Sequence, residues 1–144
     1  MIRYNSKEKV SAELVTSLQL PTVFLLKGEM GSGKTTLTKA LGNQLAFADQ
    51  VQSPTYNLKL DYQGSYLNSD LQVSHMDLYR LADKADIRDL VFEENLSQRL
   101  WIIEWPERTS FDWYTVSDTV ITISINVLEN FEREFLIYYE KADH

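Results

Sequence analysis

A phosphate-binding pattern lies early in the sequence, at residues 28–36. Gly28 and Gly33 precede Lys34 and Thr35 with the spacing of a phosphate-binding loop. Glycines allow the backbone to curl so that several N–H groups point at phosphate oxygens. In such a loop Lys34 neutralises the β- and γ-phosphates, and the Thr35 hydroxyl binds a magnesium ion. The pattern therefore predicts a site for ATP or a similar nucleotide with Mg²⁺.

The flanking residues predict the strand and the helix between which such a loop must lie. Residues 22–27 are apolar and β-prone, so a strand enters the loop. Leu37, Leu41 and Leu45 recur at helical spacing, so a helix begins near Lys34. The positive end of its dipole adds to the attraction for phosphate. An accidental match in a glycine-rich turn would not require this strand–loop–helix order.

Two carboxylates at predicted strand ends are candidates for the acidic group that fixes magnesium in phosphate-loop hydrolysis. Glu104 follows the continuously apolar run at 100–103, which is typical of a strand buried on both faces. Asp77 ends a weaker predicted strand at 71–77. Ligands bind beyond the carboxyl ends of such strands, so we expect both residues to converge with Gly28. Each also fits an ordinary solvent-facing carboxylate, and the pattern leaves open which lies nearer the metal.

Other side chains near these motifs have both a functional and a structural interpretation. Thr55 follows Ser-Pro in a turn, where its hydroxyl can sense the γ-phosphate or serve the turn alone. Trp105 can lie beside the nucleotide or belong to the core. Arg80 and Arg108 can stabilise a transferring phosphate or pair with carboxylates. We expect His75 to be a packed or hydrogen-bonded strand residue rather than a base.

The remaining pattern predicts an α/β protein. The other expected elements are a helix at 7–18 capped by Ser6, a strand at 56–62, a polar loop at 63–70, short helices within 83–95, and strands at 121–127 and 133–140. The two middle strands and the two last strands are each expected to form an antiparallel hairpin. Together these elements predict one domain over residues 1–144, a P-loop NTPase-like, three-layer α/β fold with a mixed, partly antiparallel sheet.

Composition limits the class of function. The net charge is −7, from 14 Lys and Arg against 21 Asp and Glu, so most of the surface would repel nucleic acid. A role in a nucleic-acid process would therefore act through a partner. The absence of cysteine excludes disulfides, zinc–thiolate sites and thiol catalysis, and a reducing cytoplasm is the expected location. No apolar run approaches the roughly 20 residues of a membrane span, so we expect no membrane attachment.

Four motifs, in this order, resemble the TsaE (YjeE) family, the small bacterial ATPases of the machinery that makes threonylcarbamoyladenosine in tRNA. The motifs are residues 26–37 around the loop, SPTY at 53–56, HMDLYRL at 75–81 and EWPER at 104–108. The resemblance covers nearly the whole chain. Glu29 stands where the family usually has Asp, and residues 90–96 replace a stretch that usually carries a glycine. The second departure affects the expected partner surface rather than the ATP site.

The resemblance implies a Mg²⁺-dependent ATPase that acts with the TsaD and TsaB proteins and meets tRNA only indirectly. It implies that Thr55 lies in a switch-like turn and that Trp105 lies close to the nucleotide. It also implies roles in hydrolysis or metal binding for Asp77 and Glu104. The expected site comprises, for catalysis, Lys34, Thr55, Asp77 and Glu104; for nucleotide binding, Glu29, Met30, Gly31, Ser32, Gly33, Lys34, Thr35, Thr36 and Trp105; and for the metal, Thr35 and Glu104.

Other functions can use the same loop. A small-molecule kinase usually adds a lid and an acceptor pocket, and the sequence shows no spare helical insertion for them. A nucleotide-sensing adaptor without turnover would use the acidic surface for docking. A GTPase is disfavoured because the chain has no Asn-Lys-x-Asp run. Since no lid or water-positioning motif is evident, we expect slow ATP hydrolysis by the isolated chain and faster hydrolysis with partners.

Overall fold

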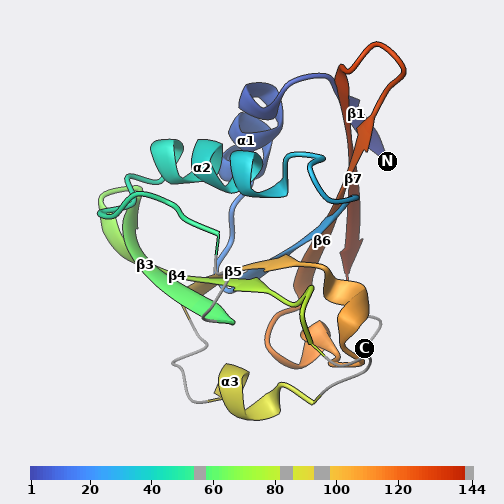
Figure 1. Cartoon of the computed structure of the whole chain (residues 1–144). Coiled ribbons are helices and arrows are strands. Elements are labelled where there is room, and N and C mark those ends of the chain that lie inside the picture. Colours follow the sequence, from blue (N-terminus) through green and yellow to red (C-terminus); the bar gives the residue numbers. More distant parts are fainter. Residues whose placement is uncertain (54–57, 82–85, 93–97, 142–144) are drawn as a thin grey trace.

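A mixed sheet forms the centre of the protein. The computed structural model describes residues 1–53, 58–81, 86–92 and 98–141, and in this part of the chain the sheet has seven strands (Figure 1). The strands are β1 (Ile2–Tyr4), β2 (Thr22–Lys27), β3 (Lys59–Tyr66), β4 (Ser69–Asp77), β5 (Arg99–Glu104), β6 (Thr119–Val127) and β7 (Arg133–Lys141). Their order is β1-β7-β6-β2-β5-β4-β3. The four strands β6, β2, β5 and β4 run parallel, whereas β3, β7 and β1 pair antiparallel towards the two edges.

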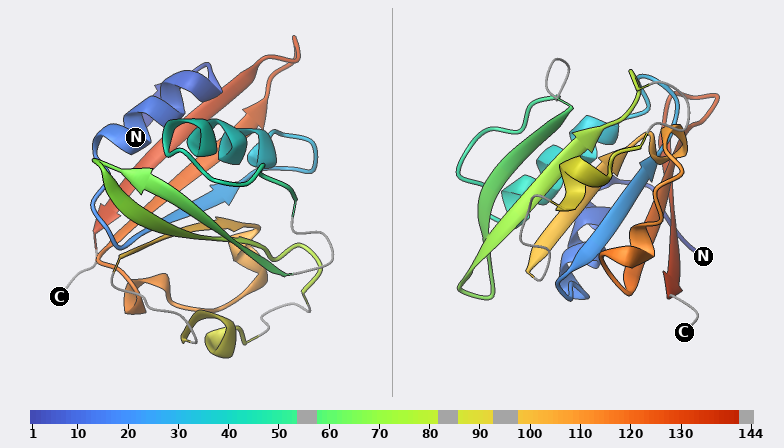
Figure 2. Two further views of the ribbon diagram at one scale, coloured as in Figure 1. Left: turned by 90° about the vertical axis from the view of Figure 1, so that its left-hand side faces the viewer. Right: turned by 90° about the horizontal axis from the view of Figure 1, so that it is seen from below.

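Helices cover both faces of the sheet and give the protein three layers. Helices α1 (Lys7–Thr16) and α2 (Lys34–Gln44) lie side by side on one face, as Figure 2 shows. The opposite face carries the short helix α3 (Arg88–Phe92) and a 3₁₀ turn at Trp113–Thr115. The predicted three-layer α/β architecture with a partly antiparallel sheet is therefore confirmed. None of the helices in the described residues is long and apolar enough to cross a membrane.

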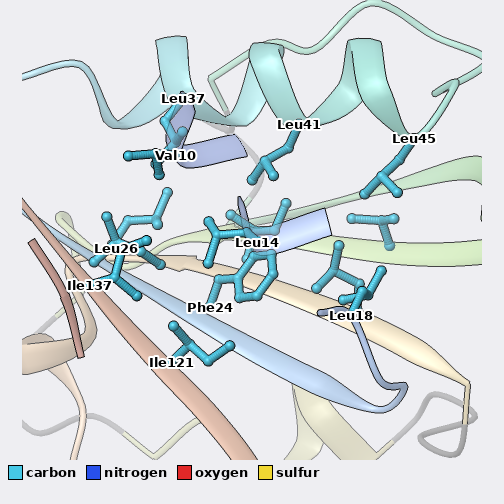
Figure 3. Packing of buried hydrophobic residues seen from close by; sticks show 14 of the residues in the cluster. Val10, Leu14, Leu18, Phe24, Leu26, Leu37, Leu41, Leu45, Ile121 and Ile137 are labelled. Carbon is cyan, nitrogen blue, oxygen red and sulfur yellow. The ribbon is translucent and has the colours of Figure 1, made fainter. Parts of the chain in front are cut away.

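Apolar side chains from α1 and α2 pack onto the first face of the sheet (Figure 3). Leu14 of α1 and Leu37 and Leu41 of α2 are fully buried, as are Phe24 and Leu26 of β2. Burying a side chain of this size contributes about 1.5–3 kcal/mol relative to leaving it exposed. This packing holds α2 against β2 and so fixes both ends of the loop that joins them.

A second core lies on the opposite face. Trp101 and Ile103 of β5 pack there with Val91 of α3 and with Trp113. The rings of Trp101 and Trp113 lie 6.1 Å apart. Because its other face carries side chains of the first core, β5 is buried along its whole length, as predicted for residues 100–103.

Helix α1 begins as predicted but ends earlier. The Ser6 hydroxyl accepts a hydrogen bond from the Lys9 N–H at 3.2 Å, which caps the helix. The helix ends at Thr16 rather than at Leu18. The Leu18 N–H donates to the Val15 carbonyl at 3.2 Å, a shorter-range bond that tightens the last turn. Leu18 is still buried, so the predicted apolar face is right although the predicted end is late.

The predicted loop at residues 63–70 is wrong. β3 and β4 continue through this segment and form the predicted antiparallel hairpin, which turns at Leu67 and Asn68. These two residues have positive φ angles of 51° and 63°. A two-residue turn with both φ angles positive has the twist of the paired strands. The polar composition misleads because β3 is an edge strand, in which alternate side chains face solvent.

The other differences concern short elements. β1 is not predicted, because three residues are too few to show an alternating pattern. Helix α3 confirms one of the short helices expected within 83–95, and residues 83–85 and 93–95 lie outside the described part of the chain. Tyr56, the expected start of the strand at 56–62, also lies outside it, and β3 begins at Lys59. The strands expected at 22–27, 71–77, 100–103, 121–127 and 133–140 are confirmed.

Candidate functional site

Three strands end at one edge of the sheet and bring the predicted site residues together. β2 leads into the loop at Gly28, β4 ends at Asp77, and β5 ends at Glu104. β2 and β4 both pair in parallel with β5, and their Leu26 and Asp77 lie opposite Glu104. The loop and both carboxylates therefore lie at the carboxyl edge of the parallel strands, as the sequence predicts.

The phosphate loop, residues 28–33, requires its glycines for different reasons. Gly31 and Gly33 have φ angles of +79° and +114°, which side-chain-bearing residues rarely adopt. Gly28 is confined by packing instead. A Cβ atom there would lie 2.4 Å from the Ser32 hydroxyl oxygen and 2.9 Å from the Ile125 carbonyl oxygen. Of the two glycines in the sequence pattern, Gly33 is thus required by backbone shape and Gly28 by close packing, and Gly31 is a further position with a positive φ angle.

The Lys34 amine lies inside the phosphate loop. Its Nζ donates to the carbonyl oxygens of Gly28 at 2.6 Å and Glu29 at 2.9 Å. It also lies 4.6 Å from the ring centre of Trp105, within cation–π range. Burial lowers the pKa of Lys34, and the charge of Glu104 is the strongest influence in the other direction. The amine is therefore placed where phosphate oxygens would enter the loop.

Glu104 joins the end of β5 to both β4 and α2. The residue is only 3% exposed. Its Oε2 lies 2.5 Å from Nε2 of His75, and the Thr35 hydroxyl lies 3.5 Å from its Oε1, at the limit of a hydrogen bond. His75 is thus a buried, hydrogen-bonded strand residue, as expected. That its partner is a residue of the predicted site is not visible in the sequence, because the two residues lie on different strands.

Asp77 lies beside Glu104 in a different environment. It is half-buried, and its Oδ1 accepts a hydrogen bond from the Tyr79 N–H at 3.0 Å. Burial raises the pKa of Asp77, the hydrogen bond from Tyr79 lowers it, and the neighbouring charge of Glu104 raises it further. Two carboxyl groups therefore meet at this edge, and Asp77 holds its proton more readily than an ordinary aspartate does.

A stack of aromatic and cationic groups forms one wall of the site. The Trp105 ring, in contact with the Lys34 amine, lies 4.9 Å from the ring of Tyr79. On the Tyr79 ring lies the Arg108 guanidinium, 5.4 Å from the ring centre. Trp105 has a positive φ of 58°, an unfavourable backbone conformation for a residue with a side chain. Of the two arginines considered from the sequence, Arg108 therefore packs on this wall, whereas Arg80 lines the adjacent cleft.

A cleft of about 710 Å³ opens over this edge of the sheet. This volume suits a ligand of nucleotide size. The predicted site residues that line it are Met30, Gly31, Gly33, Lys34, Thr35, Thr36, Asp77, Glu104 and Trp105. Of the other two nucleotide-binding candidates, Glu29 contributes its carbonyl to Lys34, and Ser32 is buried beneath the loop. Thr55 lies outside the described residues, so its role remains a prediction.

Arg133, at the start of β7, is a site residue that sequence reasoning missed. Its Nε donates to the Ser32 carbonyl at 3.1 Å, and a terminal nitrogen lies 3.3 Å from the Gly31 carbonyl. The guanidinium thereby braces the outer side of the phosphate loop. A single arginine about a hundred positions after the loop gives no signal in the sequence, because only the fold brings the two together.

The oxygen atoms that face the cleft are suitable ligands for a magnesium ion. The Thr35 hydroxyl and the carboxylate oxygens of Glu104 and Asp77 are the hard oxygen ligands that Mg²⁺ prefers. Among the described residues, no three His, Asp or Glu side chains are arranged to hold a metal ion by themselves. The residues therefore fit an ion that takes its remaining ligands from phosphates and water, as Mg²⁺ commonly does.

Comparisons with known proteins agree with this arrangement. The family model for TsaE, the threonylcarbamoyl adenosine biosynthesis protein, matches residues 3–135. The tRNA threonylcarbamoyladenosine biosynthesis protein TsaE of Treponema pallidum is 32% identical over 121 residues, which cover 83% of this chain and 84% of that protein. The protein of the same name from Rickettsia conorii is 32% identical over 133 residues, 90% of this chain and 72% of that protein.

The fold also matches a solved structure. The crystal structure of YdiB from Bacillus subtilis superposes with a TM-score of 0.63 at 23% sequence identity, over 98% of this chain and 84% of that chain. The predicted P-loop NTPase-like fold is thereby confirmed.

Proposed function

This chain belongs to the TsaE family, whose proteins act in tRNA threonylcarbamoyladenosine biosynthesis, and from that premise we propose that it binds ATP with Mg²⁺ in the cleft and hydrolyses it. In this proposal it acts in the cytoplasm with the TsaD and TsaB proteins, and these partners contact the tRNA. The net charge of −7 supports indirect contact, since an acidic surface is repelled by a phosphate backbone.

The observation that carries the proposal is the placing of Lys34 and Glu104 around the first turn of α2. The Lys34 amine lies within the loop, and Glu104 reaches Thr35, the next residue. A chain of phosphates bound by the loop N–H groups would meet the Lys34 amine. Its metal ion would meet the Thr35 hydroxyl and the Glu104 carboxylate. These are the groups that a triphosphate and its metal ion require.

Each residue has a defined task in the proposed reaction. The loop N–H groups and the N-terminus of α2 bind the phosphates, and Lys34 donates to phosphate oxygens in place of its present carbonyl partners. Thr35 and Glu104 hold the metal ion, which when bound neutralises charge on the phosphate oxygens. Asp77, beside Glu104, orients the attacking water. Its raised pKa brings it closer to the range in which a carboxylate accepts a proton effectively.

Two exposed side chains at the rim of the cleft support a role for partners. Met30 of the phosphate loop is 71% exposed, and Tyr79 of the aromatic wall is 37% exposed. A partner that covers these side chains would also exclude water from the phosphates. Water exclusion strengthens electrostatic stabilisation of the reaction. We therefore propose that the isolated chain hydrolyses ATP slowly.

Steady-state ATP hydrolysis by the chain alone, with the TsaD–TsaB pair and with each partner singly tests the proposal. We expect the pair to raise the rate by at least about tenfold, within the range that groups supplied by a partner can provide. The Thr35→Ala variant is the control, because it removes a proposed metal ligand while leaving the rim of the cleft intact. A high rate for the chain alone that the partners do not change would contradict the proposal. Nucleotide-dependent docking without turnover would instead indicate an adaptor.

A further inference from the structure

We propose that His75 is a positioning residue whose imidazole fixes the Glu104 carboxylate for magnesium binding. The inference rests on the proposed function, because it concerns the same metal ion. His75 is not among the residues that line the cleft, and the side chain to which it is hydrogen-bonded there is Glu104.

The contact between the two residues is buried on both sides. The His75 side chain is 0% exposed and the Glu104 side chain 4% exposed, and Nε2 and Oε2 are 2.5 Å apart. The other carboxylate oxygen, Oε1, is the one that lies towards Thr35. The two oxygens of Glu104 therefore have separate tasks. Oε2 is held by β4, and Oε1 is left for the cleft.

The other ring nitrogen of His75 leaves the imidazole with one described contact of this kind. Nδ1 of His75 is buried and has no hydrogen-bond partner among the described residues. Nε2 is the nitrogen that faces the carboxylate, and a proton on Nε2 is donated to Oε2 of Glu104. Within the described part of the chain, the hydrogen bond of the ring is therefore directed at Glu104.

A comparison with Asp77 shows why this contact matters for the metal. Asp77 is held by a backbone N–H two residues further along its own chain segment, and it is only half-buried. Glu104 is held by a buried ring on a neighbouring strand. Fixing a ligand in its binding orientation before the metal arrives strengthens metal binding. The geometry therefore assigns the stronger metal ligand to Glu104 and its orientation to His75.

The experiment measures ATP affinity with and without Mg²⁺ by calorimetric titration, together with the melting temperature. His75→Leu removes the donor while keeping an apolar side chain in its place. His75→Gln places an amide N–H near the position of Nε2. Val73→Ala is the matched control, because Val73 is equally buried on the same face of β4 but pairs with Leu100, away from Glu104.

We expect His75→Leu to weaken ATP binding about 10- to 100-fold when Mg²⁺ is present, the range found for groups that orient metal ligands. Binding without Mg²⁺ should stay the same, and His75→Gln should recover at least part of the loss. Val73→Ala should lower the melting temperature without changing the Mg²⁺ dependence. If His75→Leu does not fold, His75→Asn replaces it, since the shorter amide does not reach Oε2.

Two results separate the inference from the function on which it rests. If the native chain binds ATP with a clear Mg²⁺ dependence and both His75 variants retain it, the positioning role is wrong while the proposed function stands. If the native chain shows no Mg²⁺-dependent ATP binding, the proposed function itself fails and the inference fails with it. Equal losses in His75→Leu and His75→Gln would also overturn the positioning role, because an amide donor should restore the contact.

Discussion

Two clusters of polar residues meet at consecutive residues of β4, and they are built for different purposes. In the structural cluster (Asp61, Ser74 and Arg99), Arg99 donates to the Ser74 hydroxyl at 2.9 Å, and Ser74 donates to Asp61 at 2.9 Å. In the cleft cluster (Thr35, His75 and Glu104), the central carboxylate is held by the ring of His75. Because Ser74 and His75 are consecutive strand residues, the two clusters lie on opposite faces of the sheet.

The charges in the two clusters show the difference in purpose. In the structural cluster the Asp61 carboxylate lies 3.6 Å from the guanidinium of Arg99 and 3.4 Å from the amine of Lys59, so this carboxylate faces two positive charges. Around the cleft cluster, a single amine, that of Lys34, experiences the charges of several carboxylates, of which Glu104 and Asp77 act most strongly. Carboxylates that meet beside a cleft attract a cation, whereas a carboxylate paired with cations away from the cleft contributes to folding.

The largest effect expected from this comparison is on nucleotide binding. Lys34→Ala should weaken ATP binding about 10²–10³-fold, because it removes a buried charged donor from the phosphates. The fold should survive, since the amine contacts the loop and not the apolar core. Calorimetric titration of the variant measures its ATP affinity, and circular dichroism shows whether it is folded. Lys39→Ala is the control, because it removes the same charge from an exposed position of α2. Unchanged ATP affinity in Lys34→Ala would contradict the assignment of the loop.

A smaller effect, on stability alone, is expected in the structural cluster. Arg99→Met keeps the length of the side chain and its contact with Trp101 but removes the hydrogen bond to Ser74. It should lower the free energy of unfolding by about 1.5–3 kcal/mol, the usual value of a hydrogen bond to a charged group. Urea denaturation measures this loss, and ATP affinity should not change. Arg3→Met, which breaks the ion pair between the exposed Arg3 side chain and Glu134, is the control and should cost less than about 1 kcal/mol. A loss of ATP affinity in Arg99→Met would remove the distinction between the clusters.

The smallest effect expected is a pH-dependent change of stability at Asp77. Because burial raises the pKa of this carboxyl in the folded protein, its protonated form favours folding. This contribution is present below the ordinary aspartate pKa of about 3.9 and is lost as the pH rises through the raised value. Asp77→Asn should therefore be more stable than the native chain at pH 7, by less than about 1 kcal/mol, and the gain should vanish below about pH 4. Melting temperatures across this range test the sign. A gain that grows towards acid pH would contradict it.

The parts of the fold that could be predicted are those that local patterns determine. Apolar alternation marks β6, a continuous apolar run marks β5, and the glycines mark the loop between β2 and α2. The turn at Leu67 and Asn68 could not be predicted in this way, because neither residue is the glycine that such turns usually contain. The polar residues of the edge strand β3 are typical of a loop, although in the structure they pair with β4.

The site shows the same limit. Its loop and its two carboxylates could be predicted because each lies at the end of a local pattern. The hydrogen bond from His75 to Glu104 and the brace from Arg133 to the loop could not, since both join residues that only the order of the strands brings together. The ring of Tyr79 between Trp105 and Arg108 is a third contact of this kind.

A crystal structure of the protein with Mg²⁺ and a non-hydrolysable ATP analogue tests the central claim most directly. The account predicts the triphosphate within the loop, with the Lys34 amine on phosphate oxygens. It also predicts a magnesium ion at about 2.0–2.1 Å from the Thr35 hydroxyl, in an octahedral shell that includes Glu104 directly or through water. A nucleotide bound away from the loop, or a metal ion held without Thr35 and Glu104, would contradict the account.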